Sequence, residues 1–361
     1  MTIESDELVS AYFLSFVEPS YSRSGTLFNA HSKHLQKEYI KVSSGWRKIF
    51  LELLSVRRSI NKHSVVIVMS PAQKIAPLAR RLLKQKIILD AGWPLTDGIV
   101  SRGINLKKIP MLLRSYFIDF ISFHSVDLIL VESQAQLKRI SRLYVVPRSR
   151  LRVSYTGVNE MAFSKPLAPS ESYSHLKEQI LKNPKKLNML FRGSINNESG
   201  METILSAANM LVGEINLIII ANRNRLPAKI SNNCFVFSRV TEEEMRDLYE
   251  LSDITLGQIS RNKRLRYTIP HKAFEAGYFA KAYITPRANG IAELYSQNAV
   301  PFLDEVNVKG LVEKIRFLYN KEIRSGYEQQ IFKEYSQKMA QTVLISHFEK
   351  EVLAIMRNMN L

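Results

Sequence analysis

The feature that most constrains the fold is a repeated alternation of short apolar runs with amphipathic segments. In the first half, the runs AYFLSFV, SVVIVMS, KIILD, DLILVES and RLRVSYTG read as strands, and TLFNAHSKHLQKEY (26–39), PLARRLLK and AQLKRISRLY read as helices. Strands that alternate with helices form βαβ units, in which the strands are parallel. The pattern therefore predicts an α/β fold with doubly wound, Rossmann-like parallel sheets.

The same alternation restarts after a polar, proline-containing segment at 166–186. LNMLFRG, INLIIIA, CFVFSRV, DITLGQ and AYITP read as strands, and Thr241 with Glu244 forms a capping-box pair at the start of a helix. We therefore expect an N-terminal domain over 1–165, a linker over 166–186 and a C-terminal domain over 187–335. A last helix within 336–361 is expected to pack back on the N-terminal domain.

Length and composition limit the number of domains, the binding partners and the cellular compartment. A chain of 361 residues is longer than one core usually supports, which agrees with two domains. The net charge of +18 favours an anionic partner, either nucleic acid, anionic lipid or a phosphate-bearing small molecule. No nucleic-acid-binding motif is recognisable, so nucleic acid is not expected as a partner. A single cysteine, acids ahead of the first apolar run and the lack of a membrane-spanning run predict a cytoplasmic protein.

Two loops have the layout of a βα anion site. Gly25 lies in SYSRSGT, where a strand leads into a helix, and a helix start offers free N–H groups. Arg192 and Gly193 end LNMLFRG, where a guanidinium can reach a diphosphate. An ordinary βα turn would explain the glycines equally, and an exposed loop would explain the arginine.

The stretch IPHKAFEAG, residues 269–277, holds further candidates. Pro270 suits the first turn of a helix, whereas Lys272 is unfavourable at the positive end of the helix dipole unless an anion lies nearby. Glu275 could accept hydrogen bonds from a ribose diol, or it could simply favour the helix start. His271 is either a phosphate donor or a solvated side chain.

Other candidates are weaker or concern a surface. Gly290 with Ile291 could offer backbone amides to an anion, and Asp90 at the end of KIILD could orient sugar hydroxyls. The segment 104–125 mixes Lys107, Lys108 and Arg114 with apolar and aromatic residues. Such a helix suits an anionic membrane surface, and it equally suits a helix packed on the sheet.

These motifs, taken in order, resemble a known family. FRGS with SGMETILSA, then TEEEMRDLYELSDITLGQ, then PHKAFEAGYFAKAYITPRANGIAEL, are similar to the nucleotide-sugar-binding domain of retaining GT-B glycosyltransferases. SRSGTLFNAHSKHL and LRVSYTGVNEMAF resemble the other domain of that family more loosely. The resemblance spans most of the chain and implies two Rossmann-like domains that face a cleft, the N-terminal one binding the acceptor.

The resemblance also implies roles and a reaction. Arg192 would contact the donor diphosphate, Glu275 the ribose and the backbone near Val240 the base. Gly25, Gly193, Gly290 and Ile291 would lie near the diphosphate or the sugar. A UDP- or GDP-sugar would be the substrate, with retention and without metal or other cofactor. A glycan or lipid-linked acceptor in cell-surface polysaccharide or glycolipid synthesis would receive the sugar, from an enzyme on the inner face of the membrane.

Two departures from the family pattern open an alternative. Tyr267 stands where the first glutamate of the E-x7-E motif is expected, and Ser199 stands where a lysine is expected. Lys272 or Arg264, the latter within the basic run RNKRLR, could replace the missing phosphate charge. The alternative is a non-catalytic homologue that binds a nucleotide sugar or a partner transferase.

Overall fold

The computed structural model describes residues 8–19, 22–61, 63–101, 103, 105–182 and 184–357. The chain divides into two compact units, Met1–Asn159 with Gln341–Leu361, and Glu160–Ala340. We call these unit 1 and unit 2 and describe each by itself. The N-terminal acids and Ile104 lie outside the described residues.

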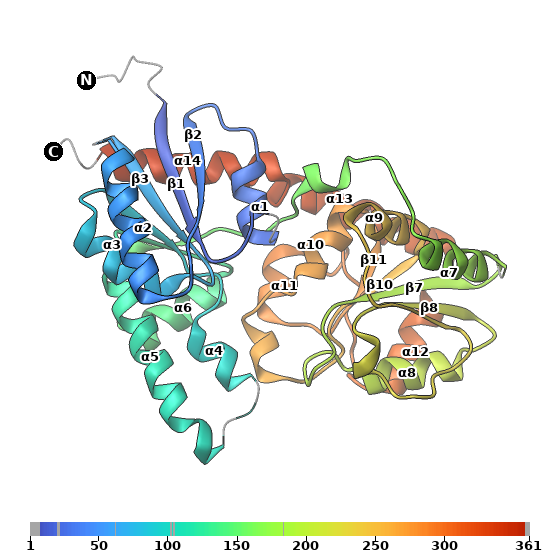
Figure 1. Cartoon of the computed structure of the whole chain (residues 1–361). Coiled ribbons are helices and arrows are strands. Elements are labelled where there is room, and N and C mark those ends of the chain that lie inside the picture. Colours follow the sequence, from blue (N-terminus) through green and yellow to red (C-terminus); the bar gives the residue numbers. More distant parts are fainter. Residues whose placement is uncertain are drawn as a thin grey trace. The chain divides into compact units, whose positions relative to one another are not determined.

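Unit 1 is built on a six-stranded parallel sheet in the order β2-β1-β3-β4-β5-β6 (Figure 1). The strands are β1 Val9–Ser15, β2 Leu35–Lys41, β3 Ser64–Met69, β4 Lys86–Asp90, β5 Leu128–Val131 and β6 Leu151–Val153. β3 is buried along its whole length, as expected for an apolar run in the middle of a parallel sheet.

Helices cover both faces of this sheet. They are α1 Ser22–Asn29, α2 Trp46–Ser59, α3 Ala76–Leu82, α4 Leu95–Val100, α5 Ile109–His124, α6 Gln134–Leu143 and α14 Gln341–Arg357, with the short 3₁₀ turns η1 Gln73–Ile75, η2 Leu106–Lys108 and η3 Arg148–Arg150. One core lies under α2, α3, α5 and α6. The other core joins β1 and α1 to α14, drawn in red beside the blue strands in Figure 1, through Phe13, Leu27 and Phe348.

Unit 2 is built on a five-stranded parallel sheet in the order β11-β10-β7-β8-β9. The strands are β7 Leu187–Arg192, β8 Ile215–Ile220, β9 Cys234–Phe237, β10 Ile254–Leu256 and β11 Ala282–Ile284. The helices and 3₁₀ turns are η4 Glu160–Phe163, α7 Glu171–Leu181, α8 Met201–Met210, η5 Arg223–Arg225, α9 Glu242–Leu251, η6 Lys263–Arg266, α10 His271–Tyr278, α11 Asn289–Leu294, α12 Val308–Phe317 and α13 Lys321–Lys338.

The two all-parallel sheets confirm the predicted α/β fold class. The capping box on α9 is present, because the Thr241 side chain accepts from the Glu244 amide and the Glu244 side chain accepts from the Thr241 amide. The segment expected as a linker, 166–186, contains α7, whose Tyr173 and Ile180 are buried.

One secondary-structure prediction is wrong. Residues 26–39 are not a single helix, since α1 ends at Asn29 and β2 begins at Leu35. β2 lies at the edge of the sheet, and Leu35 is its only buried residue. Its apolar residues Leu35, Tyr39 and Ile40 are also spaced as on one face of a helix, so the sequence LQKEYIK is compatible with either element. Pairing with β1, which the local sequence does not encode, decides the outcome.

The strand orders locate the ligand-binding edges. In unit 2 the chain order reverses between β7 and β10, and in unit 1 it reverses between β1 and β3. Open α/β sheets bind ligands at such a switch point, beyond the carboxyl ends of the strands. Each unit therefore offers one favoured position for a ligand.

Candidate functional site

The candidate site in unit 2 lies at this switch point. Arg192 is the last residue of β7, and β7 pairs with both β8 and β10. α10 begins at His271, directly after Pro270, and its first two turns carry His271, Lys272 and Glu275. The sheet and the helix thus bring Arg192 together with three residues of α10 that come much later in the sequence.

Glu275 is the centre of this group. Its side chain is buried, and its Oε1 accepts a hydrogen bond from Nη1 of Arg192. Nδ1 of His271 lies 2.9 Å from the same oxygen, and the Tyr249 hydroxyl donates to Oε2 at 2.5 Å. Both carboxylate oxygens are therefore engaged by side chains of the protein.

The charges around Glu275 keep it ionised. Burial alone would raise its pKa, but Arg192, His271 and the Tyr249 hydroxyl outweigh burial and hold the pKa well below the ordinary range. In turn Glu275 raises the pKa of Arg192. The outer part of the group is cationic, because the Arg192 side chain is 33% exposed while Glu275 lies beneath it.

Lys272 is buried beside this group. The residue is 7% exposed, and its Nζ lies 3.9 Å from the centroid of the Phe191 ring. A Cβ on Gly193, which has a φ of +137°, would lie 3.6 Å from the same Nζ. Burial lowers the pKa of Lys272 to about 7, with Glu275 opposing the shift and Arg192 adding to it. The amine therefore changes charge near neutral pH.

His271 completes the group around Glu275. Its ring is partly exposed, and its Nε2 is buried and meets no hydrogen-bond partner among the described residues. Arg192, Lys272 and His271 thus surround one carboxylate at a strand end and a helix start. Such an arrangement suits a bound anion, because a second negative charge would balance the cations.

Arg264 is placed differently from the prediction that it replaces a phosphate-binding lysine. Its Nη1 donates to both oxygens of the buried Glu198, at 2.8 and 2.9 Å. Ser199, at the expected lysine position, is buried and donates its hydroxyl to the Asn196 carbonyl. Lys272 is consequently the better placed of the two candidates for the missing charge.

The remaining candidates of unit 2 lie around the same edge. Val240 is half-buried in the loop between β9 and α9. Gly290 lies in the first turn of α11, Asn289–Leu294, and a Cβ there would lie 2.9 Å from Cγ1 of Ile269. Glycine therefore allows α11 to approach the segment before α10, and Ile291 beside it is buried.

In unit 1, Asp90 ends β4 and is fully buried. Nε of Arg23 donates to Asp90 Oδ1 at 2.5 Å, and Nη1 of Arg23 donates to the Thr156 hydroxyl at 3.1 Å. Burial raises the pKa of Asp90, and Arg23 counteracts part of this shift. Gly25 lies in α1, where a Cβ would meet the Pro19 carbonyl at 2.5 Å.

Sequence reasoning missed Tyr249, Glu198 and Arg23. Tyr249 lies on the apolar side of α9 and reads as a core residue, so only the strand order reveals that it reaches Glu275. Glu198 lies in the loop after β7, and its partner Arg264 is 66 residues away, so no local signal points to the pair. Among the described residues, no cluster of three or more His, Cys, Asp or Glu side chains could hold a metal ion.

Known proteins place this geometry in a wider class. Residues 202–353 match the family model described as glycosyl transferase-like. The whole chain is similar to a glycosyltransferase structure from Rickettsia africae, with a TM-score of 0.67, 13% identity, and coverage of 97% of this chain and 99% of that one. No curated protein matches the sequence.

Two further structures share the architecture. HepE of Anabaena, solved in complex with UDP and glucose, matches with a TM-score of 0.69 and 10% identity over 96% of this chain and all (100%) of that one. An α,α-trehalose-phosphate synthase (UDP-forming) from Burkholderia xenovorans matches with a TM-score of 0.59 and 11% identity over 93% of this chain and 84% of that one. The protein therefore has the GT-B fold, and its C-terminal part carries the glycosyl transferase-like sequence pattern.

Proposed function

We propose that the protein is a glycosyltransferase that moves a sugar from a nucleotide-diphosphate donor to a glycan or lipid-linked acceptor, with retention of configuration. The family match over 202–353 and the fold support this class of reaction. The setting is cell-surface polysaccharide or glycolipid synthesis at the cytoplasmic face of a membrane. UDP is the first nucleotide to test, because HepE is described in complex with UDP.

The observation that carries the proposal is the cationic group fixed by Glu275. Arg192 and His271 bind one buried carboxylate, and Lys272 lies against Gly193 at the end of β7. In this proposal Arg192 and Lys272 contact the donor diphosphate. Glu275 was expected to hold the ribose, but its oxygens already bind three side chains, so we assign it the positioning of Arg192 and His271.

The proposed reaction follows from where charge develops. The bond from the anomeric carbon to the diphosphate oxygen breaks, and a bond from that carbon to the acceptor oxygen forms on the same face. The acceptor's proton passes to the leaving diphosphate. Arg192 and a protonated Lys272 stabilise the negative charge that grows on the diphosphate. No step requires a metal ion or another cofactor.

Unit 1 would bind the acceptor in this scheme. Asp90 was expected to contact substrate, but it is fully buried against Arg23. We therefore assign Asp90 the role of fixing Arg23 and Thr156 near the switch point of that sheet. Gly25 lets the start of α1 approach the loop that follows β1.

The alternative function is a non-catalytic homologue that binds a nucleotide sugar or a partner transferase. Tyr267 at the position of the first motif glutamate favours it, together with the three side chains that already contact Glu275. Such a protein would keep nucleotide binding and lack turnover.

A transfer and hydrolysis assay over a panel of UDP- and GDP-sugars tests the proposal. We expect turnover with at least one donor, and its loss in Arg192→Ala and in Glu275→Ala. The matched control is Arg316→Ala on α12, which removes an equal charge whose partner Glu214 lies before β8, at the opposite edge of the sheet. Nucleotide binding without turnover of any donor would overturn the enzyme and support the alternative.

The exposed surface of α5 supports a membrane-facing position. Among the described residues no helix is long and apolar enough to cross a membrane. However, the large side chains of Leu106, Met111, Leu113 and Phe117 are exposed on η2 and α5. We propose that these side chains, with Lys107, Lys108 and Arg114, contact an anionic bilayer. Neutralising the three cations should lower co-sedimentation with anionic vesicles, and unchanged sedimentation would contradict it.

A further inference from the structure

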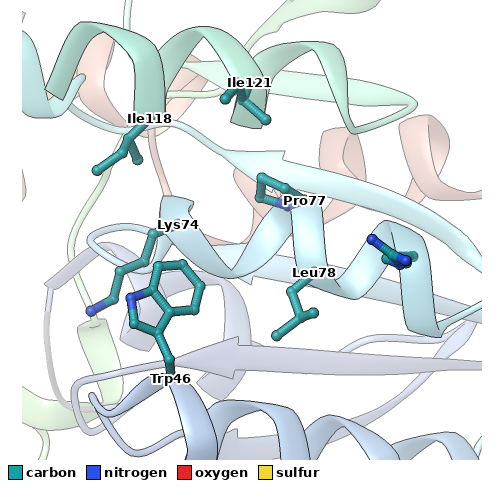
Figure 2. Close-up of a pocket in the computed structure, with 7 residues that line it drawn as sticks. Trp46, Lys74, Pro77, Leu78, Ile118 and Ile121 are labelled. Atoms are coloured by element: carbon teal, nitrogen blue, oxygen red, sulfur yellow. The ribbon is translucent and has the colours of Figure 1, made fainter. Parts of the chain in front are cut away.

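A groove on unit 1 lies apart from the sites described above. It has a volume of about 350 Å³ and lies between α2, α3 with the preceding η1, and α5. Figure 2 shows Pro77 and Leu78 along α3, with Ile118 and Ile121 of α5 on one side and Trp46 of α2 on the other. Its volume falls within the range of small-molecule sites, roughly 300–1,000 Å³.

The lining of the groove is apolar and open to solvent. Trp46 is 54% exposed and Ile121 is 51% exposed, although both are large apolar side chains. They continue directly into the exposed side of α5, where Phe117 lies. Contiguous exposed apolar surface of this kind usually marks a binding surface rather than a solvated one.

The polar residues that line the groove are the cations Lys74 and Arg81. Nζ of Lys74 is 5.7 Å from the centroid of the Trp46 ring and donates to the Ser44 carbonyl at 3.2 Å. Arg81 lines the groove further along α3, and no ion pair involves it among the described residues. The segments 46–59, 73–84 and 106–124 contain eleven Lys and Arg residues against two acidic residues. An occupant must therefore combine an apolar body with negative charge.

The groove begins next to the ligand-binding edge of the sheet. Lys74 lies in η1, which follows β3, and its Nζ lies 4.8 Å from the centroid of the Phe16 ring, just after β1. β1 and β3 flank the switch point of unit 1. A molecule lying in the groove would consequently present its polar end at the carboxyl edge, where this fold binds ligands.

We propose that the groove holds the apolar chain of a lipid-linked acceptor, with the anionic phosphate of that acceptor at Lys74. This inference rests on the proposed function, and it selects a lipid-linked acceptor over a free glycan. The chain lies against Pro77, Leu78 and Ile121, and the sugar end lies at the carboxyl edge of β1 and β3. The exposed side of α5 contacts the bilayer from which the acceptor is drawn.

Tryptophan fluorescence tests the proposal on the full chain. The sequence has two tryptophans, so Trp93→Phe leaves Trp46 as the single emitter. We expect farnesyl phosphate, below its aggregation concentration, to shift the Trp46 emission to shorter wavelength in a saturable way. Ile121→Glu should weaken this binding at least about tenfold, because it places a carboxylate beside the apolar chain. Lys74→Met should weaken farnesyl phosphate and leave farnesol unchanged.

Two control variants separate the groove from the bilayer surface. Phe117→Glu, at a side chain that is 59% exposed but does not line the groove, should lower sedimentation with phosphatidylglycerol vesicles and leave farnesyl phosphate binding intact. Met210→Glu on α8 of unit 2, where the side chain is 62% exposed, should change neither.

The outcomes decide between lipid sources and between proposals. The proposed lipid site in the groove is refuted if the Trp46 emission shows no saturable response. It is also refuted if Phe117→Glu and Ile121→Glu weaken farnesyl phosphate binding equally, which would leave only a surface that contacts the bilayer. Binding of UDP and UDP-glucose, followed by thermal shift, reports on the donor site and not on the groove. If the wild-type protein binds farnesyl phosphate but turns over no donor, the proposed function is contradicted and the lipid site in the groove is not.

Discussion

Replacing Lys272 by methionine should stabilise the protein and weaken its binding of a nucleotide sugar. The side chain is buried against Phe191, and burial lowers its pKa from 10.5 to about 7. The folded protein therefore resists charging this amine, which the unfolded chain charges freely. A residue that destabilises the fold is retained where a ligand needs it.

The magnitude follows from the pKa shift. A difference of roughly 3.5 units, at about 1.4 kcal/mol per unit, lowers the free energy of unfolding by about 5 kcal/mol when the amine is fully charged. At pH 7, where about half of the folded molecules carry the charge, the loss is about 4 kcal/mol. The contact of Nζ with the Phe191 ring offsets up to about 2 kcal/mol of this. We therefore expect Lys272→Met, which fills the same space, to raise the free energy of unfolding at pH 7 by about 2 kcal/mol.

The pH dependence has a defined sign. Because the pKa of Lys272 is lower in the folded protein, the unfolded chain binds more protons between pH 7 and 10.5. The destabilisation is full below about pH 7, declines as the pH rises, and is absent above about pH 10.5. Urea unfolding of the two proteins at pH 7 and pH 9.5 should therefore show a difference that narrows at the higher pH.

Lys272→Met should weaken donor binding, although it raises the free energy of unfolding. If the charged amine contacts the diphosphate, affinity of the wild-type protein for UDP-glucose should fall by up to about 50-fold from pH 7 to pH 9 as Lys272 loses its proton. Lys272→Met should bind weakly at both values. The matched control is Lys281→Met, because Lys281 is also partly buried but donates to the Glu250 carbonyl. A destabilised Lys272→Met with unchanged UDP-glucose affinity would refute the reasoning.

Three further predictions concern single side chains. Gly200→Ala should lower the free energy of unfolding by more than about 2 kcal/mol in urea titrations, since Gly200 has a φ of +67° and a Cβ would lie 1.8 Å from a backbone carbonyl oxygen. Asp90→Asn should lower it by about 3 kcal/mol, because the buried Arg23 would keep its charge and lose the carboxylate with which it is paired. Tyr249→Phe should lower donor affinity about threefold to tenfold, measured by calorimetry, because Glu275 loses one hydrogen bond that orients it.

Each of these has a result that would contradict it. Wild-type stability of Gly200→Ala would mean that the loop after β10 moves freely away. Asp90→Asn combined with Arg23→Met should recover stability relative to Asp90→Asn alone, and further loss would argue against an ion-pair origin. An unchanged donor affinity in Tyr249→Phe would show that Glu275 needs no orientation by the hydroxyl.

The sequence was sufficient for the fold class because the buried strands are short, apolar and regularly spaced. β3 and β8 are six residues long and buried at every position, a length typical of a buried strand and too short for most helices. The exception is β2, an edge strand whose apolar residues Leu35, Tyr39 and Ile40 are spaced as on one face of a helix. Its identity depends on β1, a partner outside its own segment.

The candidate site was found by position but not in its internal contacts. Arg192, Lys272 and Glu275 were recognised because they lie at a strand end and a helix start. The sequence could not show that other side chains of the protein bind the Glu275 carboxylate, since its partners Arg192 and Tyr249 are 83 and 26 residues away. The pairing of Arg264 with Glu198 was not predicted for the same reason, because the two residues are 66 positions apart.

The return of the chain to unit 1 through α14 has a consequence for biosynthesis. Unit 1 draws Ile345, Phe348 and Val352 of α14 into its core, yet the ribosome makes all of Glu160–Ala340 before these residues. At about 5–20 residues per second, that interval lasts roughly ten to forty seconds. During it the apolar side of β1 and α1 waits for its cover, so nascent unit 1 is a natural client for a chaperone, while unit 2 can fold as soon as it emerges.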